Sequence, residues 1–144
     1  MAKPDPIHLN IITPEHAFYD GYIDRIILPA PDGELGIEPG HEPMVISVIE
    51  GEIRMTYEKN GKPQTDIAAC SAGFAAVTQH HVLLMLQTAE WSWEIDQKRA
   101  ERDARAAQAK LRQQKSMQEY YLARSMMARA MARLRVSNRN KINN

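Results

Sequence analysis

The distribution of proline and glycine limits most strongly what this chain of 144 residues can fold into. All eight prolines lie at or before Pro63, and the last of the seven glycines is Gly73. Residues 74–144 therefore contain neither of the two residues that most readily interrupt regular structure. We expect a first part with many turns, followed by an uninterrupted second part.

The charged residues divide the chain in the same way. Residues 1–88 contain five Lys or Arg and twelve Asp or Glu, a net charge of −7, whereas residues 89–144 contain thirteen and six, a net charge of +7. Such an asymmetry indicates two units with different roles. We therefore predict a domain of residues 1–88 and a second domain of residues 89–144.

Short runs of β-branched and other apolar residues predict strands in the first domain. The expected strands are Ile7–Ile12, Tyr22–Leu28, Met44–Ile49, Glu52–Tyr57, Thr65–Cys70, Phe74–Thr78 and Val82–Leu86. Pairs such as Asp32-Gly33 and Asn60-Gly61 have the composition of tight turns. Strands at this spacing, with no long helix between them, predict an antiparallel sandwich or barrel.

Residues 93–136 consist mostly of strong helix formers. The sequence Ser116-Met117-Gln118-Glu119 resembles a capping box, which predicts one helix ending near Gln114 and a second from Met117 to about Val136. A short link between two helices produces an antiparallel hairpin. The apolar positions at helical spacing are listed here: Ala100, Ala104, Ala107 and Leu111 in the first helix, and Tyr120, Ala123, Met127, Ala130 and Leu134 in the second. Because alanine buries little surface, we expect the helix pairing to be marginal and the hairpin able to come apart.

The sequence contains no phosphate-binding loop, dinucleotide fingerprint, nucleophile elbow or zinc-protease motif, so we predict no catalytic residues. The single Cys70 excludes an internal disulfide, and we expect it to be a core residue. His80-His81 is expected to be a polar turn, and no metal site is predicted. Trp91 and Trp93 are expected to pack the helices against the first domain.

A longer motif then identifies a family. The segment Gly33-Glu34-Leu35-Gly36-Ile37, followed by Pro39-Gly40-His41 and Pro43, resembles the signature of the epsilon subunit of bacterial F-type rotary ATP synthases. The likeness extends over nearly the whole chain, from Ile7-His8-Leu9 to Arg133-Leu134-Arg135-Val136. It departs at Ala72, where a second glycine is common, and in the Asn-rich tail. The resemblance implies a mixed fold of β then α: an N-terminal antiparallel β-sandwich followed by a C-terminal antiparallel two-helix hairpin.

The resemblance also implies a non-catalytic role in the rotor, or central stalk, of a proton-translocating ATP synthase. The partners would be the gamma subunit, the ring of c subunits and the alpha and beta subunits, with Glu34 and His41 at the contacts of the sandwich. The hairpin would inhibit ATP hydrolysis when it extends into the alpha/beta ring. The location would be the cytoplasmic face of the bacterial plasma membrane, with the membrane contacted only through the complex.

A second motif, Ile95-Asp96-Gln97-Lys98-Arg99-Ala100, resembles that of epsilon subunits that sense ATP. The likeness implies an ATP site, with no cofactor required and ATP as a regulatory ligand that stabilises the folded hairpin. The implied residues are Glu90, Ile95, Asp96, Arg99, Ala100, Arg129 and Arg133. Two alternatives are a salt-bridge set among Asp96, Arg99 and Arg129, and a helix cap formed by Asp96.

Two other classes of function compete with this interpretation. A free-standing module that binds nucleic acid through the basic hairpin would need aromatic platforms among the arginines, and the sequence offers only Tyr120 and Tyr121. The sandwich, at −7, would also repel phosphates, so no nucleic-acid partner is expected. An enzyme using the acidic residues near Glu34 ranks third.

Overall fold

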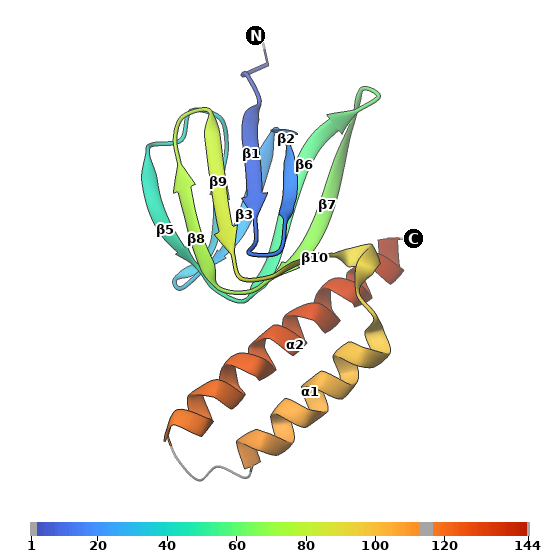
Figure 1. The fold of residues 1–144 in the computed structure, drawn as a ribbon. Helices are drawn as coiled ribbons and strands as arrows, with labels where there is room; N and C mark the ends of the chain where they lie inside the picture. Colours follow the sequence, from blue (N-terminus) through green and yellow to red (C-terminus); the bar gives the residue numbers. More distant parts are fainter. Residues whose placement is uncertain (1–2, 113–116, 144) are drawn as a thin grey trace.

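The computed structural model describes residues 3–112 and 117–143, which form a β-sandwich followed by two helices (Figure 1). The first sheet has the order β2-β1-β9-β8-β5 and the second β10-β7-β6-β3-β4. The strands of the first sheet are β2 (Ala17–Ile23), β1 (Ile7–Ile12), β9 (His81–Leu86), β8 (Gly73–Val77) and β5 (Met44–Val48). Those of the second sheet are β10 (Ala89–Trp91), β7 (Lys62–Cys70), β6 (Gly51–Lys59), β3 (Arg25–Ala30) and β4 (Gly33–Ile37). The predicted fold class is therefore confirmed, although β1 and β9 pair in parallel.

The strand predicted over Tyr22–Leu28 is wrong, because this segment belongs to two strands in different sheets. Ile23 pairs with Ile7 in the first sheet, whereas Arg25 pairs with Thr56 in the second. The chain crosses between the sheets at Asp24. The adjacent polar residues Asp24 and Arg25 interrupt the alternation, so that the buried residues Ile23 and Ile26 are three positions apart. The predicted single strand overlooked this break in the pattern.

Two further strands were not expected from the sequence. Gly33–Ile37, which is not among the strands expected from the sequence, forms β4, an edge strand that pairs with β3 alone. Its glycine-rich composition is poor for a strand, and pairing with a neighbour overrides that preference. Ala89–Trp91 forms β10 on β7, so the second sheet continues three residues beyond Thr88.

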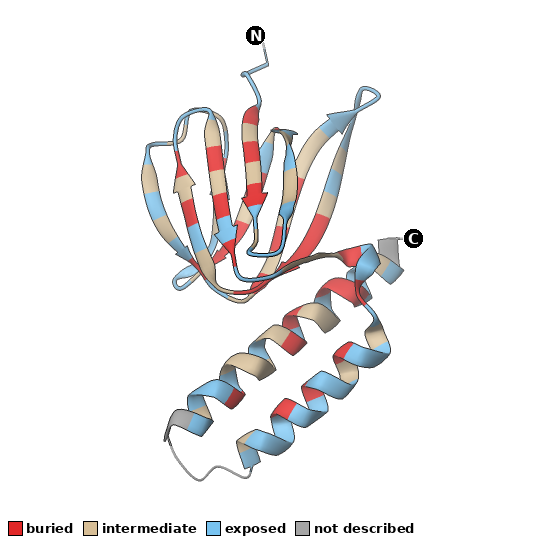
Figure 2. Cartoon of the chain, in the orientation of Figure 1, coloured by how far each residue is buried: buried red, intermediate tan, exposed pale blue. Residues whose placement is uncertain are grey.

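The sandwich core consists of aliphatic side chains that alternate along the strands and meet between the sheets (Figure 2). Leu9, Ile26, Ile53 and Leu84 are among those with no exposed surface. All members of this core lie between Ile7 and Leu86, so the sandwich buries its apolar face without using the helices.

The helices are α1 (Gln97–Arg112) and α2 (Met117–Asn143), preceded by a short 3-10 helix, η1 (Ser92–Glu94). The helix-forming region that begins at residue 93 includes the end of η1, and α1 follows from Gln97; α2 extends seven residues beyond the predicted end at about Val136. The cap expected at Ser116 lies outside the described residues. Ala100, Ala104 and Ala107 are buried as predicted.

The hairpin lies across the end of the sandwich opposite the N-terminus, with α2 against β6 and β7 (Figure 1). A small cluster of Ile67, Ala69, Ile95, Ala100 and Val136 joins the two parts. The buried face of α2 thus continues to Val136, beyond the helical stripe predicted to end at Leu134.

Aromatic rings fix the connection between the sandwich and the hairpin. Trp91 stacks on Phe18 of β2 with ring centroids 4.5 Å apart, and Trp93 stacks on Trp91 at 4.9 Å. Trp91 packs against the sandwich core, whereas Trp93 remains 56% exposed. The two tryptophans therefore attach the start of the helical part to the sandwich, in agreement with the packing role predicted for them.

Candidate functional site

Three charged side chains from three different elements meet where the hairpin touches the sandwich. Arg133 of α2 lies with its Nε 2.8 Å from Oε1 of Glu90 in β10, and its Nη2 donates to Oε2 of the same carboxylate at 3.2 Å. Its Nη1 donates to Oδ2 of Asp103 in α1 at 3.1 Å. The arginine side chain is 18% exposed. One guanidinium therefore links the last strand to both helices.

This ion-pair cluster, defined as Glu90, Asp103 and Arg133, borders a cavity of about 360 Å³ between the hairpin and the sandwich. The cavity is lined by Ala69, Cys70, Thr88, Glu90, Asp103, Ala106, Met126, Arg129, Ala130 and Arg133. We call it the interface cavity. Its walls combine apolar surface with charged groups of both signs, a composition suited to a small polar ligand with an apolar portion.

Arg129 also lines the interface cavity, one helical turn before Arg133 on α2. Within the described ranges, Arg129 makes no ion pair. Its guanidinium therefore retains donors for an incoming anion, and the fork geometry of arginine suits phosphate oxygens.

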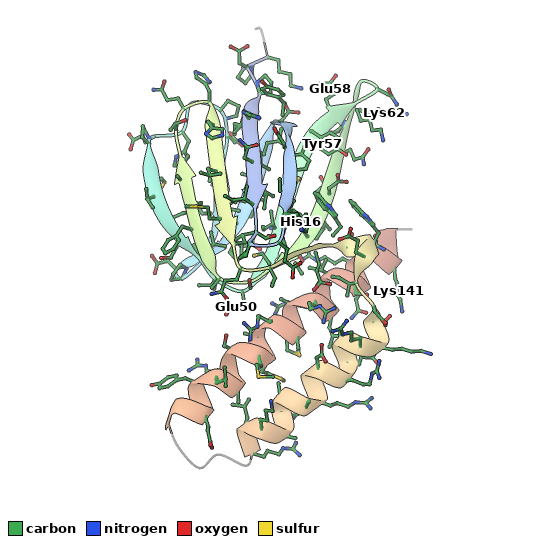
Figure 3. All side chains as sticks on the ribbon, viewed as in Figure 1. His16, Glu50, Tyr57, Glu58, Lys62 and Lys141 are labelled. Carbon is green, nitrogen blue, oxygen red and sulfur yellow. The ribbon has the colours of Figure 1, made fainter. Side chains whose placement is uncertain are left out.

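A second hollow, of about 370 Å³, lies on the other side of the ion-pair cluster. It is lined by Thr13, Glu15, His16, Gln87, Thr88, Ala89, Glu90, Arg99 and Arg133. Figure 3 shows His16 at the end of the sandwich that faces the hairpin. Arg99 borders this hollow and not the interface cavity, so the pair Glu90–Arg133 separates it from Arg129.

Three other residues of the predicted ATP site have structural roles in the hairpin and in its attachment to the sandwich. Asp96 caps α1, because its Oδ1 accepts a hydrogen bond from the backbone N–H of Arg99 at 3.2 Å. Ile95 and Ala100 are buried in the small cluster that joins the hairpin to the sandwich. Of the two alternatives considered, the cap formed by Asp96 is present. Among the described residues, the salt bridges at this position join Arg133 to Glu90 and Asp103, and none of them includes Arg99 or Arg129.

Sequence reasoning missed Asp103, although a signal was available. Asp103 lies three residues after Ala100 and directly before Ala104, both of them on the alanine face that we expected to meet the second helix. A carboxylate beside an otherwise apolar stripe needs a partner, and Arg133 provides it.

Cys70 lines the interface cavity and is 4% exposed. Burial raises the pKa of its thiol to about 12. Its Sγ donates to the backbone oxygen of Ile49 at 3.6 Å, so the thiol is a packed core group, as predicted.

The structure does not bring Glu34 and His41 together. Glu34 is the second residue of β4, and its Oε2 accepts from Nη2 of Arg54 at 2.6 Å; this contact raises the pKa of Arg54. His41 lies four residues beyond the other end of β4, where Gly40 donates its backbone N–H to the oxygen of Gln79.

The two residues therefore occupy opposite ends of the same edge strand. The hollow beside Glu34 also includes Arg135 and Arg139 of α2, whereas the hollow beside His41 includes Arg25 and Glu38. A partner touching both residues would have to extend along β4.

No group of three or more His, Cys, Asp or Glu side chains in the described part of the chain is placed to hold a metal ion. His81 begins β9, and its Nε2 lies 3.0 Å from Nδ2 of Asn10. Neither α1 nor α2 offers, over its described length, an apolar stretch that could span a bilayer.

Comparison with known proteins agrees with this architecture. Residues 6–92 match the model of the ATP synthase delta/epsilon chain β-sandwich domain, and residues 94–138 match that of its long α-helix domain. The ATP synthase epsilon chain of Caldanaerobacter subterraneus is 35% identical over 132 residues, 92% of this chain and 94% of that one. The epsilon chain of Bacillus licheniformis is 37% identical over 131 residues, 91% and 97% of the two chains.

A solved structure has the same fold. A chain of the mitochondrial ATP synthase of Euglena gracilis superposes with a TM-score of 0.79, covering 96% of this chain and 84% of that one at 23% identity. Since the family models together span the sandwich and both helices, this chain belongs to the ATP synthase delta/epsilon family, as an epsilon subunit of the F-type enzyme.

Proposed function

We propose that this chain is a non-catalytic subunit of the central stalk that joins the catalytic head to the c-ring, and that α1 and α2 inhibit ATP hydrolysis. Its membership of the epsilon family supports a place in the rotor. The observation most relevant to regulation is the interface cavity, because it exists only while the hairpin lies against the sandwich. A ligand in this cavity would favour the folded hairpin.

The weak attachment of the hairpin supports a movable element. The cluster that joins it to the sandwich is small, and several further contacts are polar, such as Ser125 Oγ to Glu50 Oε1 at 3.0 Å. Figure 3 shows Glu50 at the end of the sandwich nearest α2. Arg139 of α2 similarly donates to Glu52. Polar contacts of this kind contribute little net stability each, so the hairpin can detach while the sandwich keeps its own core.

We propose ATP as the ligand that stabilises the folded hairpin. Arg129 and Arg133 would bind phosphate oxygens, and Glu90 would accept a hydrogen bond from the adenine amino group or remain paired with Arg133. A ligand at about 100 times its Kd stabilises the form that binds it by roughly 2.7 kcal/mol. That contribution shifts an evenly balanced hairpin about a hundredfold towards the folded, non-inhibitory state.

The subunit contacts are proposed along β4 and at its two ends. Glu34 is exposed there and His41 is half-buried, and the net negative charge of residues 1–88 suits basic partner surfaces. The gamma subunit and the c-ring are the proposed partners of the sandwich, and the alpha and beta subunits those of the extended hairpin. The proposed location is peripheral, on the cytoplasmic face of the bacterial plasma membrane.

The inhibitory role is tested in the assembled ATP synthase. ATP hydrolysis is compared between enzyme containing the full chain and enzyme containing a chain that ends at Ser92, which retains the whole sandwich core. We expect hydrolysis to increase several-fold without the helices, most clearly at low ATP. Equal rates with equal subunit content would reject an inhibitory hairpin.

ATP binding is tested on the full chain by calorimetric titration with and without magnesium. We expect saturable binding at one site that Arg129→Ala weakens at least tenfold, because the unpaired guanidinium in the cavity is lost. Arg124→Ala is the matched control, since Arg124 is exposed on the same helix and does not line the cavity. Absence of binding up to millimolar ATP would leave the hairpin responsive to protein partners alone.

A further inference from the structure

We infer that Asp103 is a specificity residue of the interface cavity, which competes with nucleotide phosphates for Arg133 and thereby lowers the affinity for ligands of high negative charge. The inference rests on the nucleotide binding proposed above. It concerns how strongly this particular chain binds ATP relative to ADP and AMP.

The geometry of Arg133 supports competition. The three nitrogens of its guanidinium already face carboxylate oxygens, at 2.8 and 3.2 Å from Glu90 and 3.1 Å from Asp103. Nη1 and Nη2 each donate one N–H to a carboxylate, so a phosphate oxygen that reaches this guanidinium shares it with these two acceptors or displaces one of them. In the present arrangement, the carboxylates occupy part of the donor face that phosphate oxygens would use.

Asp103 is the acceptor more easily displaced. Glu90 engages Arg133 with both oxygens, and its side chain is 35% exposed, whereas Asp103 uses one oxygen and is 52% exposed. The pair with two close N···O approaches and lower solvent exposure is the stronger of the two. We therefore expect Glu90 to hold Arg133 in place while Asp103 gives way.

The charge of the cavity lining leads to the same conclusion. Its charged side chains are Arg129, Arg133, Glu90 and Asp103, a formal sum of zero. A carboxylate within the cavity repels each additional negative charge on the ligand, and this repulsion is stronger at a partly buried site than in bulk water. Asp103 therefore opposes the binding of ATP more than that of AMP.

The packing of the hairpin does not depend on the charge of Asp103. Ala100, Ala104 and Ala107 form the buried face of α1, and Asp103 lies beside them with most of its carboxylate open to water. The substitution Asp103→Asn keeps the size of the side chain and one hydrogen-bonding oxygen. It removes the charge with little change in packing.

The test is calorimetric titration of the full chain and its Asp103→Asn variant with ATP, ADP and AMP, with magnesium absent. We expect the variant to bind ATP roughly five- to tenfold more tightly, ADP with a smaller gain and AMP with the smallest. Glu101→Gln is the matched control, because it removes a charge from α1 outside the cavity, where Glu101 accepts from Gln97 at 3.3 Å. The control should leave all three affinities unchanged.

Hydrogen exchange of the α1 and α2 amides, measured without nucleotide, determines whether the variant hairpin is still folded. If Asp103→Asn changed the affinities for ATP, ADP and AMP by the same factor, the change would reflect altered hairpin folding and would overturn the inference. An increase in ATP affinity no larger than that caused by Glu101→Gln would also overturn it. If the native chain and the Asp103→Asn variant bound ATP with equal affinity, the role of Asp103 would be rejected, but the proposed ATP site would still be supported.

The remaining outcomes concern the native chain. Binding by Asp103→Asn alone would support the inference and would show that the native cavity excludes ATP. Binding by neither protein would overturn both the inference and the proposed ATP site.

Discussion

Arg133 of α2 and Glu90 of β10 form a two-point ion pair across the boundary between the hairpin and the sandwich, with N···O distances of 2.8 and 3.2 Å. The two residues are 43 positions apart in the sequence. Because Asp103 of α1 joins the same guanidinium, loss of Arg133 removes the cation with which both carboxylates pair.

We therefore expect Arg133→Ala to destabilise the docked hairpin by about 1–2 kcal/mol, allowing for solvent screening of the half-exposed Asp103. Native-state hydrogen exchange should show faster exchange in α1 and α2, and unchanged exchange in the sandwich strands. Arg124→Ala provides the comparison, since that exposed arginine of α2 should leave exchange unaltered. Equal exchange in the two variants would contradict a contribution of the cluster to docking.

The alanine face of α1 determines how closely the helices approach. Ala107 has no exposed surface, so Ala107→Leu introduces three carbons where the helices leave no room. We expect a loss of about 1–3 kcal/mol in hairpin stability, visible as reduced helical circular dichroism at intermediate urea concentrations. Ala109→Leu, at an exposed position of the same helix, should have the same far-ultraviolet signal as the native chain throughout the titration. A hairpin that tolerated both substitutions equally would not be packed through this face.

Gly73, at the start of β8, lies against the backbone of β9. A Cβ at this position would fall 1.9 Å from the backbone oxygen of Met85, which is too close for any side chain. Gly73→Ala should therefore lower the free energy of unfolding of the sandwich by at least about 2 kcal/mol, because the ladder between β8 and β9 must distort. Gly36→Ala is the control in the same chemical denaturation experiment, since its Cβ would meet only the Arg25 side chain, at ordinary van der Waals distances of 3.7 Å from Nη2 and 3.9 Å from Nε.

The buried thiol of Cys70 predicts a loss of stability at alkaline pH. Because burial raises its pKa from 9.0 to about 12, the folded chain keeps the thiol protonated where the unfolded chain ionises it. The resulting stabilisation is complete below about pH 9 and declines as the pH rises from 9 towards 12. Urea denaturation at pH 7, 9.5 and 10.5 should show a steeper decline for the native chain than for Cys70→Ala.

Tyr57, whose pKa is also raised to about 12 by burial, is present in both proteins of that comparison, so its contribution cancels in the difference. If the free energy of unfolding declined equally with pH in the native chain and in Cys70→Ala, the thiol would have to be exposed to solvent before it ionises. The Ala variant is expected to be less stable overall, since it leaves a space in the core.

The sequence predicted the features that depend on neighbours along the chain. The turn at Asn60-Gly61 follows from two residues that tolerate positive φ, and both adopt it, at 55° and 75°. The buried alanines of α1 follow from their spacing alone. The cap at Asp96 was one of the alternatives considered from the sequence. It requires only a carboxylate three residues before the backbone N–H that donates the hydrogen bond.

Contacts between segments that are distant in the sequence could not be predicted from such local patterns. The sequence contains several carboxylates and arginines that a folded hairpin could pair, and helical spacing gives no reason to choose Arg133 with Glu90 and Asp103 over Asp96 with Arg99 and Arg129. The crossing of the chain between sheets at Asp24 is a different case, because the adjacent polar residues Asp24 and Arg25 do interrupt the alternating pattern and the prediction overlooked that signal.

The sequence by itself thus determined the two-part architecture, the extent of the turns and the small-residue faces of the helices, because these follow from backbone preferences and from the burial of apolar side chains at a fixed period. The tertiary structure alone decided where the charges lie. It placed Glu34 and His41 at opposite ends of β4 and gathered Glu90, Asp103 and Arg133 beside a cavity. Ion pairs form between whichever groups the packing of the apolar faces brings within reach, and that packing is fixed by the whole chain.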